Sequence, residues 1–119
     1  MNQLFIFLLS QNRKKRDNFY MLIHSVIFWL KKNLTEEDII LFEQNVRLLE
    51  KISAVEQLFV GRPSATAKRP VIDDSYDFCL TVVLKNLAAH DAYQQDPLHL
   101  DFINRCSHMW ERVKIYDAD

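Results

Sequence analysis

The segment DAYQQDPLH, residues 91–99, places a tyrosine and a histidine on either side of an Asp-Pro pair. Asp96 is a favourable N-cap and proline is favoured at the first helical position, so a helix is predicted to begin at Pro97 with His99 in its first turn. The positive end of that helix disfavours imidazolium, which leaves His99 a neutral imidazole able to accept a proton near pH 7. Tyr93, ending the preceding helix, can donate a hydrogen bond to a developing enolate across the bend. Together the two side chains have the chemistry for enolisation or aldol condensation.

A purely structural interpretation of the same residues is also open. Tyr93 then packs in the core with its hydroxyl near water, His99 pairs with a backbone group at the helix junction, and His24 packs under a helix. The four histidines show no HxxxH or HxH spacing, so no metal site is predicted, although His24 and His99 can converge in space. His90 and His108 are expected on helix surfaces.

Four strands and three helices are predicted around this segment. Stretches rich in β-branched and aromatic residues predict strands over residues 22–30, 54–61, 76–84 and 110–117. Thr35 is the expected N-cap of a long helix, Asn86 caps a short one, and Asp96 caps the last. The order β-α-β-β-α-β, with the second helical stretch broken at Asp96, predicts an α+β, ferredoxin-like fold with a four-stranded antiparallel sheet.

The first predicted strand, residues 22–30, is apolar on both faces. One face carries a histidine among apolar residues and comprises Leu22, His24, Val26, Phe28 and Leu30; the other comprises Ile23, Ser25, Ile27 and Trp29. The helices can cover only one face, and an uncovered apolar patch favours aggregation. We therefore predict a homodimer in which two sheets pack face to face and form a β-barrel, through Ile23, Ile27, Trp29 and Val83. The alternative is a monomer whose N-terminal residues fold over that face.

The composition narrows the class of protein. A chain of 119 residues that is 49% hydrophobic and 26% charged is typical of one globular domain. Its net charge of −1 lacks the basic excess of nucleic-acid-binding proteins. Residues 4–9 form an apolar run too short for a membrane span, and basic residues follow it, unlike in a signal peptide. We expect residues 1–20 to be a poorly ordered tail or an over-long start, and residues 21–119 to form the domain. Both cysteines are expected to be buried free thiols. The protein is expected to be cytoplasmic, without nucleic-acid or membrane partners.

Several of these features together resemble the stress-responsive α/β-barrel domain (Dabb) family, over about residues 21–117. They are the segment HSVIFWLK with its early histidine, the capped helix that follows, the spacing of Tyr93 and His99, and the closing segment WERVKIYD. The resemblance implies a ferredoxin-like fold and a dimer with a barrel at its interface. Most members have no assigned activity. This sequence departs from the family at Asp96, where a histidine often stands.

The resemblance implies two classes of function. The first is a dimeric protein that binds a small apolar or aromatic molecule in a pocket between helices and sheet, with His24, Phe28 and Tyr76 in the pocket wall. The second is an enzyme: a plant branch of the family cyclises polyketides by aldol condensation without cofactor or metal, and its catalytic pair matches Tyr93 and His99. A related dimeric α/β-barrel monooxygenase is a further alternative. No cofactor is expected for this chain.

Overall fold

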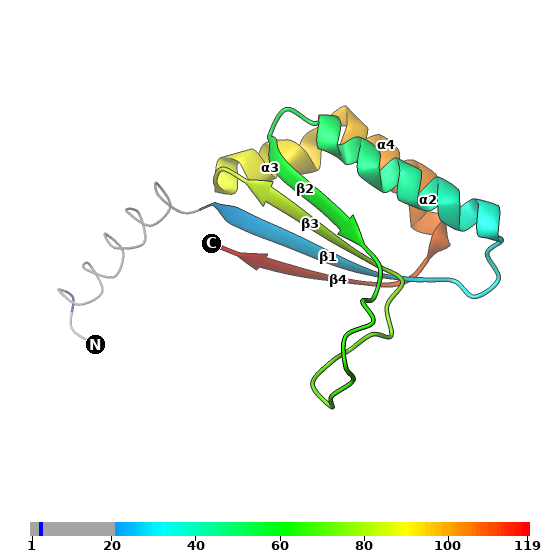
Figure 1. Cartoon of the computed structure of the whole chain (residues 1–119). Coiled ribbons are helices and arrows are strands. Elements are labelled where there is room, and N and C mark those ends of the chain that lie inside the picture. Colours follow the sequence, from blue (N-terminus) through cyan, green and yellow to red (C-terminus); the bar gives the residue numbers. More distant parts are fainter. Residues whose placement is uncertain (1–2, 4–20) are drawn as a thin grey trace.

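Four antiparallel strands form one sheet in the order β2-β3-β1-β4, and the helices lie against one of its faces (Figure 1). The elements follow one another as β1 (Leu22–Leu30), α2 (Glu36–Leu48), η1 (Leu49–Lys51), β2 (Val55–Gly61), β3 (Phe78–Leu84), α3 (Leu87–Gln95), α4 (Pro97–Cys106), η2 (Ser107–Met109) and β4 (Trp110–Ala118). The predicted α+β, ferredoxin-like arrangement is confirmed.

The structure, a computed structural model, describes residue 3 and residues 21–119. Apart from residue 3, the tail predicted for residues 1–20 lies outside the described residues. None of the helices in the described part of the chain is long and apolar enough to span a membrane.

The inner strand β1 alternates in burial along its whole length. Its inward-facing side chains are buried and the intervening ones are partly exposed; the buried set is Leu22, His24, Val26, Phe28 and Leu30. In the two flanking ladders, His24 lies opposite Val82 of β3 and Asp117 of β4. The predicted division of this strand into two faces is confirmed, and it places His24 among the core side chains beneath the helices.

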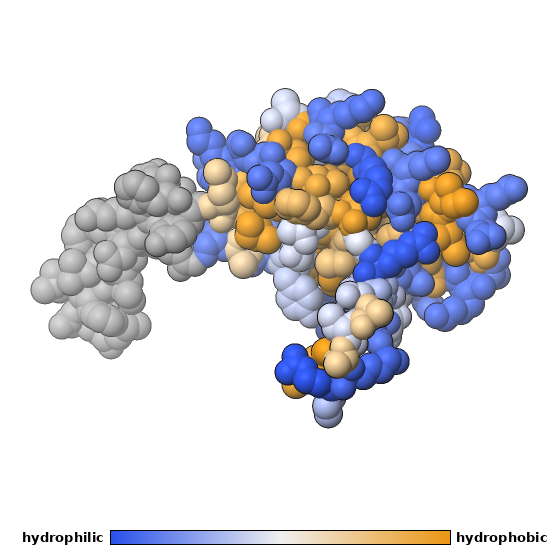
Figure 2. Space-filling view, viewed as in Figure 1, coloured by the Kyte–Doolittle hydropathy of each residue, from blue (hydrophilic) through white to orange (hydrophobic). Residues whose placement is uncertain are grey.

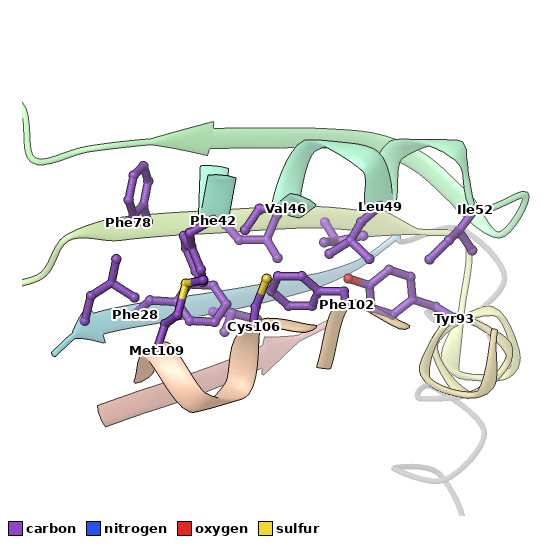
Figure 3. Close-up of a cluster of buried hydrophobic side chains, with 14 of the residues drawn as sticks. Phe28, Phe42, Val46, Leu49, Ile52, Phe78, Tyr93, Phe102, Cys106 and Met109 are labelled. Carbon is purple, nitrogen blue, oxygen red and sulfur yellow. The ribbon is translucent and has the colours of Figure 1, made fainter. Parts of the chain in front are cut away.

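Helix α2 begins where the sequence predicts, because Thr35 and Asp38 form a capping box. The Thr35 hydroxyl accepts a hydrogen bond from the Asp38 N–H at 3.1 Å, and the Asp38 carboxylate accepts one from the Thr35 N–H at 3.0 Å. The helix buries Phe42 and Val46. In the core, the Phe42 ring packs edge-on against Phe28, with ring centroids 5.1 Å apart (Figure 3). This aromatic contact fastens α2 to the middle of the sheet.

Helices α3 and α4 meet at Asp96. The Asn86 side chain caps α3 by accepting a hydrogen bond from the Ala89 N–H, and the Asp96 side chain caps α4 by accepting one from the Leu98 N–H. Asp96 is extended, with φ −62° and ψ 139°, and Pro97 stands in the first turn of α4. Both helix starts agree with the sequence prediction.

Strand β3 begins at Phe78, later than the predicted start at Tyr76. Asp77 interrupts the ladder there. Its N–H donates to the Phe28 carbonyl at 2.9 Å, and its carboxylate accepts a hydrogen bond from the Leu30 N–H at 2.7 Å. A side-chain oxygen therefore takes the place of the backbone carbonyl that would continue the pairing, and the alternation of β3 does not extend to Tyr76.

The sheet face opposite the helices carries a group of apolar side chains, which we call the outer face. Four of them are partly exposed, namely Ile23, Ile27, Trp29 and Val83. Phe59 and Tyr116, which the strand registers place on the same face, are 58% and 57% exposed. The loop of residues 62–77 projects away from the sheet, and the surface it shows in Figure 2 is largely hydrophilic.

Both cysteines are free, as predicted, but only Cys106 is buried. Burial raises the pKa of the Cys106 thiol to about 11, so this thiol is protonated and unreactive at neutral pH. The predicted burial of Cys79 is wrong, because Cys79 lies opposite Ile27 on the outer face and is partly exposed.

Candidate functional site

A cavity of about 120 Å³ lies between the inner face of the sheet and helices α3 and α4. Its wall is mainly apolar and includes His24 and Phe28 of β1, Tyr93 of α3, His99 of α4 and Trp110 of β4. The structure thus brings together both residues of the predicted catalytic pair and two of the predicted pocket residues.

Tyr93 and His99 contact each other across the helix break. Their ring centroids are 4.8 Å apart, with the ring planes at 58°. The His24 ring centroid lies 5.8 Å from that of Tyr93. Tyr93 is only 1% exposed, so these contacts lie inside the molecule. The three rings form one continuous group in the cavity wall, as the sequence analysis expected.

The surroundings keep His99 and Tyr93 neutral. Burial, followed by the electrostatic influence of His24, lowers the pKa of His99 below its ordinary value of 6.5, while a hydrogen bond with the Gln94 backbone and the charge of Asp96 oppose the shift. Burial also raises the pKa of the Tyr93 phenol above its ordinary value of 10.0. At neutral pH, His99 can therefore accept a proton or a hydrogen bond, and Tyr93 can donate one.

Two buried nitrogen atoms of cavity-lining residues have no hydrogen-bond partner within the described part of the chain. They are Nδ1 of His99 and Nε1 of Trp110. An unpaired buried polar atom costs ~1–3 kcal/mol, so proteins usually satisfy such atoms with protein, solvent or ligand. A molecule in the cavity can supply the missing partners. Trp110 was not among the predicted pocket residues, because its position at the start of a strand gives no sign of a role in the pocket.

His24 is buried, and a carboxylate lies beside it. Its Nδ1 is 2.5 Å from Oδ1 of Asp117, its cross-strand neighbour on β4. The ring of His90 approaches the same place, with its centroid 5.2 Å from that of His24 and its Nε2 3.9 Å from Oδ2 of Asp117. The predicted surface position of His90 is wrong, since its side chain is only 18% exposed. The sequence did not point to Asp117, because its proximity to His24 depends on the strand register.

Tyr76 does not line this cavity, contrary to the prediction. It lines a separate hollow on the outer face, together with Trp29 and Arg112. The physical reason is the interruption at Asp77, which begins β3 at Phe78 and removes Tyr76 from the alternation of the strand.

The chain is similar in sequence and in fold to proteins of one known family. Residues 22–119 match the family model described as the Stress responsive A/B Barrel Domain (Dabb). No curated protein matches the chain by sequence.

Solved structures include several with the same arrangement of strands and helices. A Dabb family protein with a ferredoxin-like fold from Mesorhizobium loti has 25% identity and a TM-score of 0.68, over 83% of this chain and 95% of that chain. A hydroxynitrile lyase from Passiflora edulis has 16% identity and a TM-score of 0.70, over 82% of this chain and 91% of that chain. A dimeric ferredoxin-like protein of unknown function from Thermobifida fusca has 20% identity and a TM-score of 0.67, over 85% and 95% of the two chains.

We predict that His99 makes the protein less stable as the pH falls. The unfolded chain should titrate at the ordinary value of 6.5, whereas burial lowers the pKa of His99 in the folded state. Between the two pKa values the unfolded chain binds more protons, so the free energy of unfolding decreases as the pH falls below 6.5. The variant His99→Gln should show a shallower decrease in urea unfolding from mildly basic to mildly acidic pH. The matched control is His108→Gln, at an exposed histidine; identical pH dependence in the two variants would contradict the assignment.

Proposed function

Because the chain belongs to the stress responsive A/B barrel domain family, we propose that it binds one small apolar or aromatic molecule in the cavity beside Tyr93 and His99. The observation that carries this proposal is a mainly apolar cavity whose wall holds two buried nitrogens, on His99 and Trp110, without partners in the described part of the chain. An apolar wall with a few placed polar groups is typical of ligand sites. The ligand that fits has an apolar body and one hydrogen-bonding group.

The volume of the cavity limits the size of this ligand. At about 120 Å³, the cavity is somewhat smaller than the ~150 Å³ of an engineered cavity that binds benzene. A single ring with a small polar substituent, or a similarly compact molecule, suits this space. A long linear polyketide would require the cavity to widen.

The contact between Tyr93 and His99 supports a second function, which is proton transfer at a carbon atom of a bound carbonyl compound. His99, which burial keeps neutral, takes a proton from the carbon next to the carbonyl, and Tyr93 donates a hydrogen bond to the enolate oxygen that forms. The Passiflora edulis hydroxynitrile lyase is an enzyme with a similar fold. This function would act on the same compact class of molecule that the cavity admits.

The outer face supports an association of two copies. It presents Ile23, Ile27, Trp29 and Val83, and each apolar side chain of this size contributes ~1.5–3 kcal/mol when fully buried. A second copy would bring an identical apolar surface against it through a two-fold axis. The similar Thermobifida fusca protein is described as dimeric. The homodimer would leave the cavity accessible, because the cavity lies on the other side of the sheet.

For the binding function, phenol and toluene form a matched pair of probes. Both have the size of one ring, but only phenol can pair with a nitrogen of His99 or Trp110, so phenol should bind more tightly. The variant Ile103→Phe fills the cavity and should abolish binding of both probes, as followed by amide chemical shifts in NMR titrations. The control Ile40→Phe, at a half-exposed position of α2, should bind like the wild type. Equal binding by the two variants would exclude this cavity as the site.

For proton transfer, acetone in D₂O is a suitable probe, because it is compact enough for the cavity and deuterium uptake at its methyl groups reports enolisation. General-base catalysis contributes roughly 10²–10⁴-fold, so His99→Ala should lose at least tenfold of the exchange rate while His108→Ala keeps it. The decrease of kcat/KM at acidic pH should occur only below pH 6.5, since burial lowers the pKa of His99 from that value. Exchange that survives in His99→Ala would remove His99 from the mechanism and leave the binding function standing.

For the dimer, a charge on the outer face should separate the two copies. Trp29→Asp and Val83→Lys would each place a charge in the buried interface, so both should shift the molar mass from dimer to monomer in light scattering after size exclusion. Ile40→Asp, on the helical side of the molecule, should remain dimeric. Circular dichroism would confirm that each variant is folded; a folded dimer of both outer-face variants would place the interface elsewhere.

A further inference from the structure

We propose that His24, His90 and Asp117 bind one divalent transition-metal ion of the Zn²⁺ class. One ligand atom from each residue lies within 4.8 Å of the other two. The site adjoins the cavity proposed above and shares His24 with its wall, but neither His90 nor Asp117 lines the cavity. No short sequence motif marks this site, because its three residues come from β1, α3 and β4, which are far apart in the sequence.

The fold brings the three side chains together on well-defined elements. His24 and Asp117 are directly opposite each other in the ladder between β1 and β4, so their side chains point to the same face of the sheet. His90 approaches from α3, with its ring edge-on to His24 at a centroid separation of 5.2 Å. The site is part buried, with His24 inside, His90 at an intermediate depth and Asp117 open to solvent. An ion could therefore enter from the side of Asp117.

The contacts of His90 leave its Nε2 atom available to bind an ion. Its Nδ1 is 3.1 Å from Oδ1 of Asp91, and a proton on Nδ1 makes this contact a hydrogen bond. Nε2 then carries the free lone pair, and it is Nε2 that faces Asp117, at 3.9 Å from Oδ2. A carboxylate that accepts the second ring N–H is the usual outer partner of a metal-binding histidine. Asp91 is thus a positioning residue for His90.

The distances between the ligand atoms suit a small ion after modest side-chain movement. Metal–ligand bonds of ~2.0–2.1 Å in a tetrahedral site put ligand atoms roughly 3.3–3.5 Å apart. Two observed separations, each to a different carboxylate oxygen of Asp117, lie on either side of this value. His24 Nδ1 is 2.5 Å from Oδ1, and His90 Nε2 is 3.9 Å from Oδ2. The ion would take the place of the direct contact between His24 Nδ1 and Asp117 Oδ1.

The ligand chemistry selects the class of ion. Two imidazole nitrogens and one carboxylate favour Zn²⁺, Co²⁺ or Ni²⁺, whereas Mg²⁺ and Ca²⁺ prefer oxygen ligands. Three protein ligands leave one position of a tetrahedral ion for water or another small molecule. Because the ion would join β1, α3 and β4, binding should also raise the melting temperature of the protein.

Calorimetric titration of the full, chelator-treated chain with Zn²⁺ tests the proposal. We expect one ion per chain, a higher melting temperature, and at least tenfold weaker binding in both His90→Ala and Asp117→Asn. The control His108→Ala, at an exposed histidine outside the cluster, should bind as the wild type does. Both test variants change residues that are not among the buried core, so circular dichroism should show them folded.

Titration with Co²⁺ identifies the ligands directly. Nitrogen and oxygen ligation gives visible bands without the intense near-ultraviolet band of a cobalt–thiolate bond, which Cys79 would produce. Loss of the visible bands in His90→Ala and Asp117→Asn, with no thiolate band in the wild type, is the expected result. The proposal would be overturned by a thiolate band, or by Zn²⁺ affinity in His90→Ala equal to that in His108→Ala.

Discussion

The helix break at Asp96 is the constraint on which the candidate site depends. The Asp96 N–H donates to the Tyr93 carbonyl at 3.2 Å, and its carboxylate accepts a hydrogen bond from the Leu98 N–H at 2.8 Å, so one residue ends α3 and begins α4. In a continuous helix, a separation of six residues corresponds to about 9 Å of rise and roughly 240° of rotation. Tyr93 and His99 would then lie on different faces. The break instead brings their ring centroids to 4.8 Å.

The sheet register supplies the other half of the site. A buried histidine needs a polar partner, and the pairing of β1 with β4 provides one by placing Asp117 opposite His24. A slip of one residue between the strands would turn Asp117 to the outer face and leave His24 without that carboxylate. The apolar neighbours that fix the register, such as Phe28 opposite Val113, therefore also determine the polar chemistry beside the cavity.

Local signals in the sequence were enough to predict the elements, because a cap such as Thr35 or Asn86 acts within a few residues. The period of two in β1 also predicted which of its side chains enter the core. The errors at Tyr76 and His90 arose from contacts between distant residues. Asp77 bonds to the end of β1 and so displaces Tyr76 from the strand, and His90 turns inward because His24 and Asp117 lie below it. Neither contact has a spacing that a single sequence reveals.

The imidazoles of His24 and His99, which both lie beside Tyr93, differ in the partners of their Nδ1 atoms. Nδ1 of His24 is engaged with Asp117, whereas Nδ1 of His99 has no partner in the described part of the chain. A base that takes a proton from a bound molecule needs a free lone pair, and Nδ1 of His99 can offer one. His24 is moreover the second cause of the lowered pKa of His99. His24 therefore helps to keep the imidazole of His99 in the neutral form that can bind or accept a proton.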